Sequence, residues 1–248
     1  MMHRRRGIYI LPNLFTTGAL FAGFYSIVAA MNAQFESAAI AIIVAMILDG
    51  MDGRIARLTN TQSDFGVQYD SLSDMVSFGL APALVIYQWS LASLGKLGWL
   101  AAFIYAAATA LRLARFNTQA ASAGKYYFQG LPSPAAAGLI ASLIWFAETL
   151  DLEDGGSILF ITFPVTVIAG ILMVSNIRYH SFKQFDLKGR VPFIAVLIVV
   201  LVFVFIASEP SSVLFIVSLV YAVSGPVYTL MEIRKHRASR KPPETISE

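Results

Sequence analysis

The sequence predicts an all-α protein, a multi-pass bundle of transmembrane helices. Of the 248 residues, 57% are hydrophobic and only 13% are charged, whereas a soluble domain carries roughly 25% charged residues. The apolar residues form segments long enough for helices that cross about 30 Å of hydrocarbon. The chain contains no cysteine, which excludes disulfides, thiolate catalysis and cysteine–zinc sites.

Eight apolar segments are expected to form the transmembrane helices. They are residues 11–31, 36–58, 67–92, 97–118, 132–150, 157–175, 191–208 and 211–232. The first segment follows the basic stretch Arg4–Arg6 but has no small-residue cleavage site, so we expect it to be retained as a helix. Pro12 and Pro192 stand near the start of their segments, where a missing N–H costs little. The basic tail, residues 234–248, is expected to be disordered.

The distribution of charge predicts the orientation of these helices. If the eight segments alternate across the membrane, 17 of the 18 Lys and Arg residues fall on one side, and only Lys96 falls on the other. By the positive-inside rule the basic side is cytoplasmic, so both termini are expected inside the cell, with the protein in the cell (inner) membrane. This topology accounts for the net charge of +3, and no nucleic-acid partner is expected.

Four aspartates lie in or beside apolar segments, where carboxylates are unfavourable. They are Asp49, Asp52, Asp70 and Asp74. A carboxylate at membrane depth costs at least about 2.5 kcal/mol, and four together also repel one another. Protonation or bound cations would offset this cost, and the spacing of the aspartates favours cations.

The spacing places the acids on two helical stripes that can face each other. Asp49 and Asp52 share one face of the second segment, and Asp70 and Asp74 are four residues apart on the third. The connecting turn, residues 59–64, is short and polar, so the two helices are expected to be antiparallel neighbours. The acids should therefore meet near the cytoplasmic end of the bundle.

Ligands that are all oxygen suit a hard cation such as Mg²⁺ or Mn²⁺. Four carboxylates can bridge two such ions, an arrangement that supports phosphoryl chemistry. Gly53 and Ala56 reduce the bulk on the same stripe, so a flat ligand can approach the backbone, although small residues also serve helix packing. Arg57 offers a guanidinium to a phosphate.

The pattern Asp49-x-x-Asp52-Gly53-x-x-Ala56-Arg57, eight residues, Gly66-x-x-x-Asp70-x-x-x-Asp74 resembles the signature of the CDP-alcohol phosphotransferase family, and every fixed position is present. The resemblance implies a six-helix core, residues 1–180, followed by two further helices, residues 181–233. It also implies a homodimer with a site open to the cytoplasm. The four aspartates would hold two divalent metals, and Asp74 would act as the general base.

The resemblance also implies a set of residues that bind the CDP-linked lipid. They are Asn13, Thr16, Asp52, Gly53, Ala56, Arg57 and Ser63. Asn13 and Thr16 belong to a short element at the start of the first segment, for which helix capping is the alternative interpretation.

Three stretches are similar to family members that transfer the phosphatidyl group of CDP-diacylglycerol to L-serine and release CMP: residues 12–18, 110–117 and 128–137. Arg112 and Arg115 are expected to hold the serine carboxylate or a lipid phosphate, or to be ordinary cytoplasmic anchors. Glycerol 3-phosphate, inositol phosphate and choline remain alternative acceptors. A divalent-cation transporter is the alternative from another class, although its site would lie nearer the midplane and within repeated halves.

The predicted topology can be tested directly because the chain has no native cysteine. Single cysteines introduced beside Ser63 and beside Gly155 should react with a membrane-impermeant thiol reagent from opposite faces of the membrane. Labelling of both positions from the same face would contradict the predicted spans.

Overall fold

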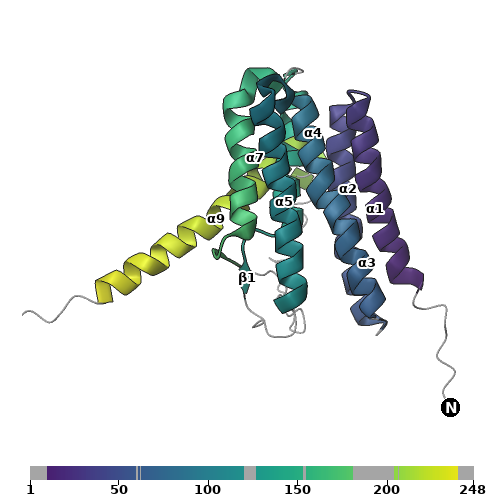
Figure 1. Ribbon diagram of the computed structural model, residues 1–248, viewed down its shortest axis with the longest axis vertical. Coiled ribbons are helices and arrows are strands. Elements are labelled where there is room, and N and C mark those ends of the chain that lie inside the picture. The colour runs from purple at the N-terminus through teal and green to yellow at the C-terminus, as the bar shows by residue number, and fades with distance from the viewer. Residues whose placement is uncertain are drawn as a thin grey trace, which may run out of the picture.

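The computed structural model describes residues 10–59, 61, 63–119, 127–152, 155–180, 204–205 and 207–239. Most of its helices run side by side in one bundle, whereas the last helix leans away from it (Figure 1). The α-helices are α1 (Ile10–Met31), α2 (Phe35–Leu58), α3 (Asp64–Asp74), α4 (Ala81–Trp89), α5 (Lys96–Gln119), α6 (Ser133–Thr149), α7 (Leu159–Val174) and α9 (Pro210–Ser239). The shorter elements are the π-helix η1 (Met75–Leu80), the 3₁₀ turns η2 (Leu91–Leu94) and η3 (Gly155–Ile158), and strands β1 (Tyr127–Gln129) and β2 (Arg178–His180).

The all-α membrane-type fold is confirmed, with helices at seven of the eight predicted segments. Segment 67–92 is built from α3, η1 and α4, which continue one another as a single rod. The predicted segment 191–208 lies outside the described residues except for 204–205 and 207–208. The tail was predicted to begin at residue 234, whereas α9 continues to Ser239. The residues after Ser239 lie outside the described part of the chain, so a disordered tail stays a prediction. No helix-breaking residue stands before Pro242, so nothing local ends the helix at Arg234.

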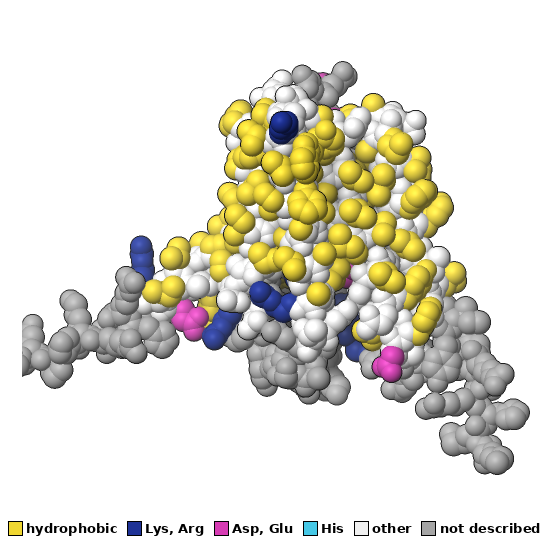
Figure 2. Space-filling model, in the orientation of Figure 1, with side chains coloured by type: hydrophobic (Ala, Val, Ile, Leu, Met, Phe, Trp, Pro, Cys, Tyr) yellow, Lys and Arg dark blue, Asp and Glu magenta, His cyan; other side chains and the backbone are white. Residues whose placement is uncertain are grey.

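The outer surface of the bundle suits a lipid environment. Within the described part of the chain, four helical stretches are long and apolar enough to cross a membrane: Pro12–Met31, Lys96–Thr118, Gly156–Val174 and Pro210–Arg234. Figure 2 shows hydrophobic side chains covering the visible face, with Lys and Arg gathered at the end where β1 lies. The remaining long helix, α2, carries Asp49, Asp52 and Arg57 of the predicted site.

Small residues let α1 approach its neighbours closely. Ala29 of α1 and Ala38 of α2 are buried, and the hydroxyl of Ser26 donates a hydrogen bond of 2.8 Å to the Ala38 carbonyl. A Cβ atom at Gly23 would lie 2.7 Å from the Cα of Ser77. Only glycine therefore allows α1 to pack this closely against the rod formed by α3, η1 and α4.

The π-helix η1 begins directly after Asp74. Its Phe78 carbonyl accepts a hydrogen bond of 3.1 Å from the hydroxyl of Tyr105 on α5, and the Ser77 hydroxyl donates to the Ala19 carbonyl at 3.0 Å. A π-turn contains about one residue more than an α-turn and is frequent at functional sites. The extra residue rotates α4 relative to α3, so the acidic face of α3 and the packed face of α4 can both turn inward.

The two short strands were not predicted. β1 pairs antiparallel with β2, with Phe128 opposite Tyr179, and the amide of Gly130 donates to the Ile177 carbonyl at 2.8 Å. Each strand has three residues, so the pair leaves the fold class unchanged. It joins the segment between α5 and α6 to the segment after α7.

Candidate active site

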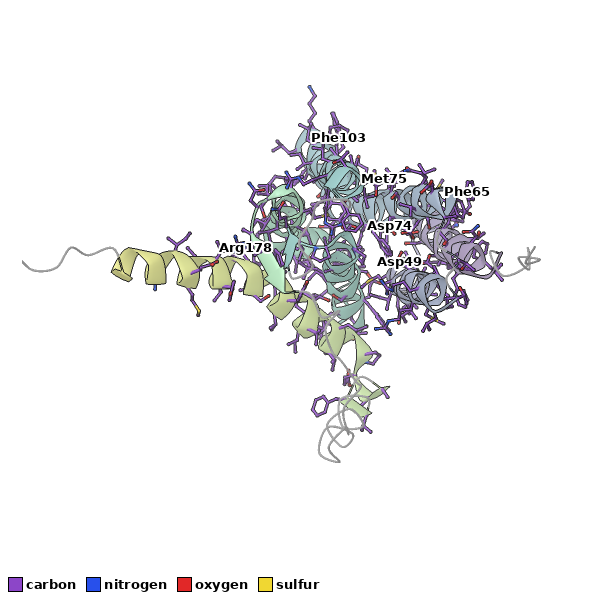
Figure 3. All side chains as sticks on the ribbon, turned by 90° about the horizontal axis from the view of Figure 1, so that it is seen from below. Asp49, Phe65, Asp74, Met75, Phe103 and Arg178 are labelled. Carbon is purple, nitrogen blue, oxygen red and sulfur yellow. The ribbon has the colours of Figure 1, made fainter. Side chains whose placement is uncertain are left out.

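Three carboxylates converge between α2 and α3. Asp49, Asp70 and Asp74 each offer an oxygen that lies within 4.8 Å of the other two. Figure 3, seen from below, places Asp49 and Asp74 beside each other in the interior, whereas Phe65 and Phe103 point outward. The spacing of four residues puts Asp70 and Asp74 on one face of α3, and the short turn after α2 brings Asp49 opposite them.

The chemistry of this acidic cluster fits a hard divalent cation. Three like charges at this distance repel one another. The Oδ1 atom of Asp70 is buried and has no hydrogen-bond partner among the described residues, and such an unsatisfied acceptor is costly. A cation satisfies the acceptor and removes the repulsion, and an all-oxygen donor set suits Mg²⁺ or Mn²⁺.

Asp52 lies beside the acidic cluster but is not one of its three converging groups. It interacts electrostatically with Asp49 and Asp70, and its Oδ2 accepts a hydrogen bond of 2.7 Å from the hydroxyl of Thr16. Thr16 is itself buried, and its carbonyl accepts from the hydroxyl of Ser73 at 3.1 Å. The structure thus places Thr16 where it orients Asp52, and contact between Thr16 and the CDP-linked lipid stays a prediction.

The other predicted lipid-binding residues surround the outer edge of the site. Gly53 is exposed, and a Cβ atom there would meet nothing within 4 Å. Arg57 is also exposed, and Ala56 is half-buried. The Ser63 hydroxyl accepts from the amide of Gly66 at 3.1 Å, which makes Ser63 the N-cap of α3.

Asn13 lies against the first turn of α3. A Cβ atom at Gly66 would lie 3.7 Å from its side-chain oxygen. The start of α1 therefore lies next to the N-terminus of α3, and α1 also packs along α2. A helix N-terminus favours anions.

The two arginines of α5, Arg112 and Arg115, have different environments. Arg112 is half-buried, its Nη1 donates to the Ser133 hydroxyl at 2.9 Å, and it interacts electrostatically with Asp74. Its Nε is buried without a hydrogen-bond partner in the described part of the chain. Arg115 is directed to the end of α7, where its Nη1 lies 3.5 Å from Oδ1 of Asn176. Arg112 is therefore the arginine of this pair that interacts with the acidic cluster, and its contact with an acceptor or a lipid phosphate stays a prediction.

Several residues that support the site were missed by sequence analysis. The side chains of Asn117 and Ser71 are joined at 3.0 Å and tie α5 to α3. Ser133 accepts a hydrogen bond from Arg112. It stands in the stretch 128–137 that carried the family resemblance, so the sequence did contain an indication of its role.

A helical membrane bundle with a carboxylate cluster between two adjacent helices is suited to metal-assisted chemistry on phosphates. Residues 9–177 match the family model described as CDP-alcohol phosphatidyltransferase. The match covers more than half of the chain, and the chain belongs to this family.

Three relatives share the name CDP-diacylglycerol–serine O-phosphatidyltransferase. The Helicobacter pylori (strain ATCC 700392 / 26695) protein is 37% identical over 228 residues, which cover 91% of this chain and 94% of that protein. The Mycobacterium bovis protein is 41% identical over 185 residues, 70% of this chain and 62% of that protein. The Bacillus subtilis protein is 32% identical over 174 residues, 70% of this chain and 92% of that protein.

The fit of a cation to the acidic cluster predicts a change in thermal stability. Mn²⁺ or Mg²⁺ at about 100 times its Kd should raise the melting temperature of the purified protein by about 5–10 °C. Asp70→Asn keeps the shape of the side chain but removes a charge, so it should reduce this shift. In chelator, the variant should be at least as stable as the wild type, because repulsion is weaker.

The matched control is Asp151→Asn, which removes an exposed acid outside the cluster and should leave the metal response unchanged. An equal metal response in Asp70→Asn and the wild type would show that the cluster is not the site of binding.

Proposed function

We propose that the protein is a phosphatidylserine synthase, which transfers the phosphatidyl group of CDP-diacylglycerol to the hydroxyl of L-serine and releases CMP. The observation that carries the proposal is the acidic cluster, found in a chain that matches the Helicobacter pylori relative over 91% of its length. Within this reaction, the serine oxygen attacks the phosphorus that carries diacylglycerol, and the bond from that phosphorus to CMP breaks.

Asp74 is proposed as the general base. A serine hydroxyl is a weak nucleophile at neutral pH, and Asp74 accepts its proton as the new bond forms. Arg112, which interacts electrostatically with Asp74, pairs with the serine carboxylate. Its unpartnered Nε and a terminal nitrogen offer the fork that binds a carboxylate with two hydrogen bonds. The acceptor hydroxyl is then held beside the base.

The residues at the outer edge of the site are proposed to bind the nucleotide. The open space at Gly53 lets the CDP moiety approach the backbone of α2. Arg57 neutralises charge on the departing CMP. The other residues proposed to contact the nucleotide are Ala56, Asn13 and Ser63, the N-cap of α3. Thr16 acts through Asp52, whose carboxylate it orients.

The metal centre is proposed to consist of two Mg²⁺ or Mn²⁺ ions held by Asp49, Asp52, Asp70 and Asp74. When bound, such ions neutralise phosphate oxygens and stabilise the charge that develops on attacking and leaving oxygens. Asp52 lies beside the three converging carboxylates, which supports a set of four ligands.

The site is proposed to open to the cytoplasm in the cell (inner) membrane, with both termini on the same side. The gathering of Lys and Arg at one end of the bundle supports this orientation. The acyl chains of the donor remain in the bilayer while its headgroup enters the site. A homodimer is proposed from the family resemblance.

The charge near the acidic cluster favours serine over the other acceptors. One arginine, Arg112, interacts with Asp74, whereas Arg115 is directed toward Asn176. A single guanidinium matches a single carboxylate. Glycerol 3-phosphate and inositol phosphate carry more negative charge and would need further cationic groups, and choline carries no carboxylate at all.

An assay of CMP release tests the function. Purified protein supplied with CDP-diacylglycerol, Mn²⁺ or Mg²⁺ and a panel of alcohols should release CMP with L-serine and much less with glycerol 3-phosphate, inositol phosphate or choline. Chelation should abolish the release, and added metal should restore it. Full activity in excess chelator, or a preference for another alcohol, would contradict the proposal.

Two variants separate the proposed roles of the aspartates. Asp74→Asn removes the basicity and keeps the shape, so CDP-diacylglycerol should still bind while single-turnover CMP release falls by roughly 10²–10⁴. Asp49→Asn should instead weaken the binding of both metal and donor lipid. A rate near that of the wild type in Asp74→Asn, measured at saturating metal, would place the base elsewhere.

A further inference from the structure

One face of α5 lies against the rod formed by α3, η1 and α4. A Cβ atom at Gly79 would lie 3.2 Å from Cγ2 of Thr109, and the side chains of Asn117 and Ser71 are joined at 3.0 Å. The order of these two contacts shows that α5 runs antiparallel to the rod. Arg112 stands three residues after Thr109, which puts both on the same face of α5. Its side chain therefore leaves α5 on the side that packs against the rod.

The same two contacts place Arg112 along the rod. Asp74 stands between Ser71 and Gly79, the residues of the rod that contact α5 on either side of Arg112. The packing of the helices thus brings Arg112 level with the proposed general base. This placement follows from side-chain contacts on both sides of Arg112.

Ser133 fixes one edge of the Arg112 guanidinium. Nη1 of Arg112 donates to the Ser133 hydroxyl at 2.9 Å, whereas Nε is buried without a hydrogen-bond partner among the described residues. The Ser133 side chain is itself fully buried, so solvent does not compete for its hydroxyl. Nε and Nη2 form the other edge of the guanidinium, and a carboxylate binds an arginine through two such adjacent nitrogens.

The backbone holds Ser133 in place from the far side. α6 begins at Ser133, directly after a turn that is pinned to the end of α7. The amide of Leu131 donates to the Leu172 carbonyl at 3.0 Å. Gly130 has a positive φ of 76°, and a Cβ atom there would collide with the Met173 carbonyl oxygen. The Ser133 hydroxyl is therefore a fixed point against which the arginine is set.

We infer that Ser133 is a positioning residue for the acceptor, which holds Nη1 of Arg112 so that the edge formed by Nε and Nη2 faces the carboxylate of the acceptor. The inference rests on the proposed function and adds to it that the start of α6 orients the acceptor. A guanidinium that is fixed at one edge presents the other in a single orientation, so less freedom is lost when a carboxylate binds. A hydrogen bond that served packing alone would affect donor, acceptor and stability together.

Replacement of Ser133 should affect the acceptor and not the donor. Ser133→Ala removes the hydroxyl and adds no bulk. The KM for L-serine should rise roughly tenfold, the lower end of what a hydrogen bond to a charged group contributes. The kcat and the KM for CDP-diacylglycerol should stay within about twofold of the wild type, because neither the chemical step nor the donor loses a contact. In an Arg112→Lys background, the same replacement should add little, since Ser133 acts through the guanidinium.

Two further variants complete the test. Ser133→Thr keeps a hydroxyl at this position and should leave the KM for serine close to that of the wild type. The matched control is Ser142→Ala, which removes an equally buried hydroxyl from the same helix. That hydroxyl donates to the Leu139 carbonyl at 3.3 Å, within α6, so its loss should leave all kinetic constants unchanged.

An unchanged KM for serine in Ser133→Ala would overturn the inference. An equal rise in the KM values of serine and CDP-diacylglycerol with a lower melting temperature would do the same, and so would a folded Ser133→Thr protein whose KM for serine rises as far as that expected for Ser133→Ala. Wild-type protein that releases no CMP with serine would instead overturn the proposed function itself.

Discussion

The cost of burying carboxylates inside an apolar bundle is the constraint on which the rest of the structure depends. Asp49, Asp70 and Asp74 meet within 4.8 Å, a distance at which like charges repel strongly where water is scarce. A protein selected only for stability would avoid such an arrangement. A bound cation would offset this cost, and the same cation would make the site suitable for phosphate chemistry.

Much of the surrounding structure keeps these acids in place. Thr16 orients Asp52, and Ser73 binds the backbone of Thr16. The pair of Asn117 and Ser71 holds α3 against α5. These hydrogen bonds connect four helices, α1, α2, α3 and α5, around one cluster, so a change of position in one helix would alter the distances between the carboxylates.

The parts of the fold that depend on local pattern could be predicted from the sequence, and the parts that depend on distant contacts could not. The length and composition of apolar segments predicted the helices, and the spacing of four residues placed Asp70 and Asp74 on one face. The pairing of β1 with β2 joins segments about 50 residues apart, and no local pattern signals it. The attachment of α9 to β2 likewise depends on a distant contact, because the ring of Tyr179 packs against Gly225.

The π-helix after Asp74 has a consequence for how this chain tolerates insertions and deletions. A residue removed between Asp70 and Asp74 would turn Asp70 by about 100° relative to Asp74, and the cluster would be lost. A residue removed within Met75–Leu80 would keep the spacing of the acids, but it would convert the π-turn into an ordinary α-turn and turn the packed face of α4 away from the core. The rod of α3, η1 and α4 therefore meets two requirements at once, the position of the carboxylates and the packing of α4, and a change of length on either side of Asp74 disturbs one of them.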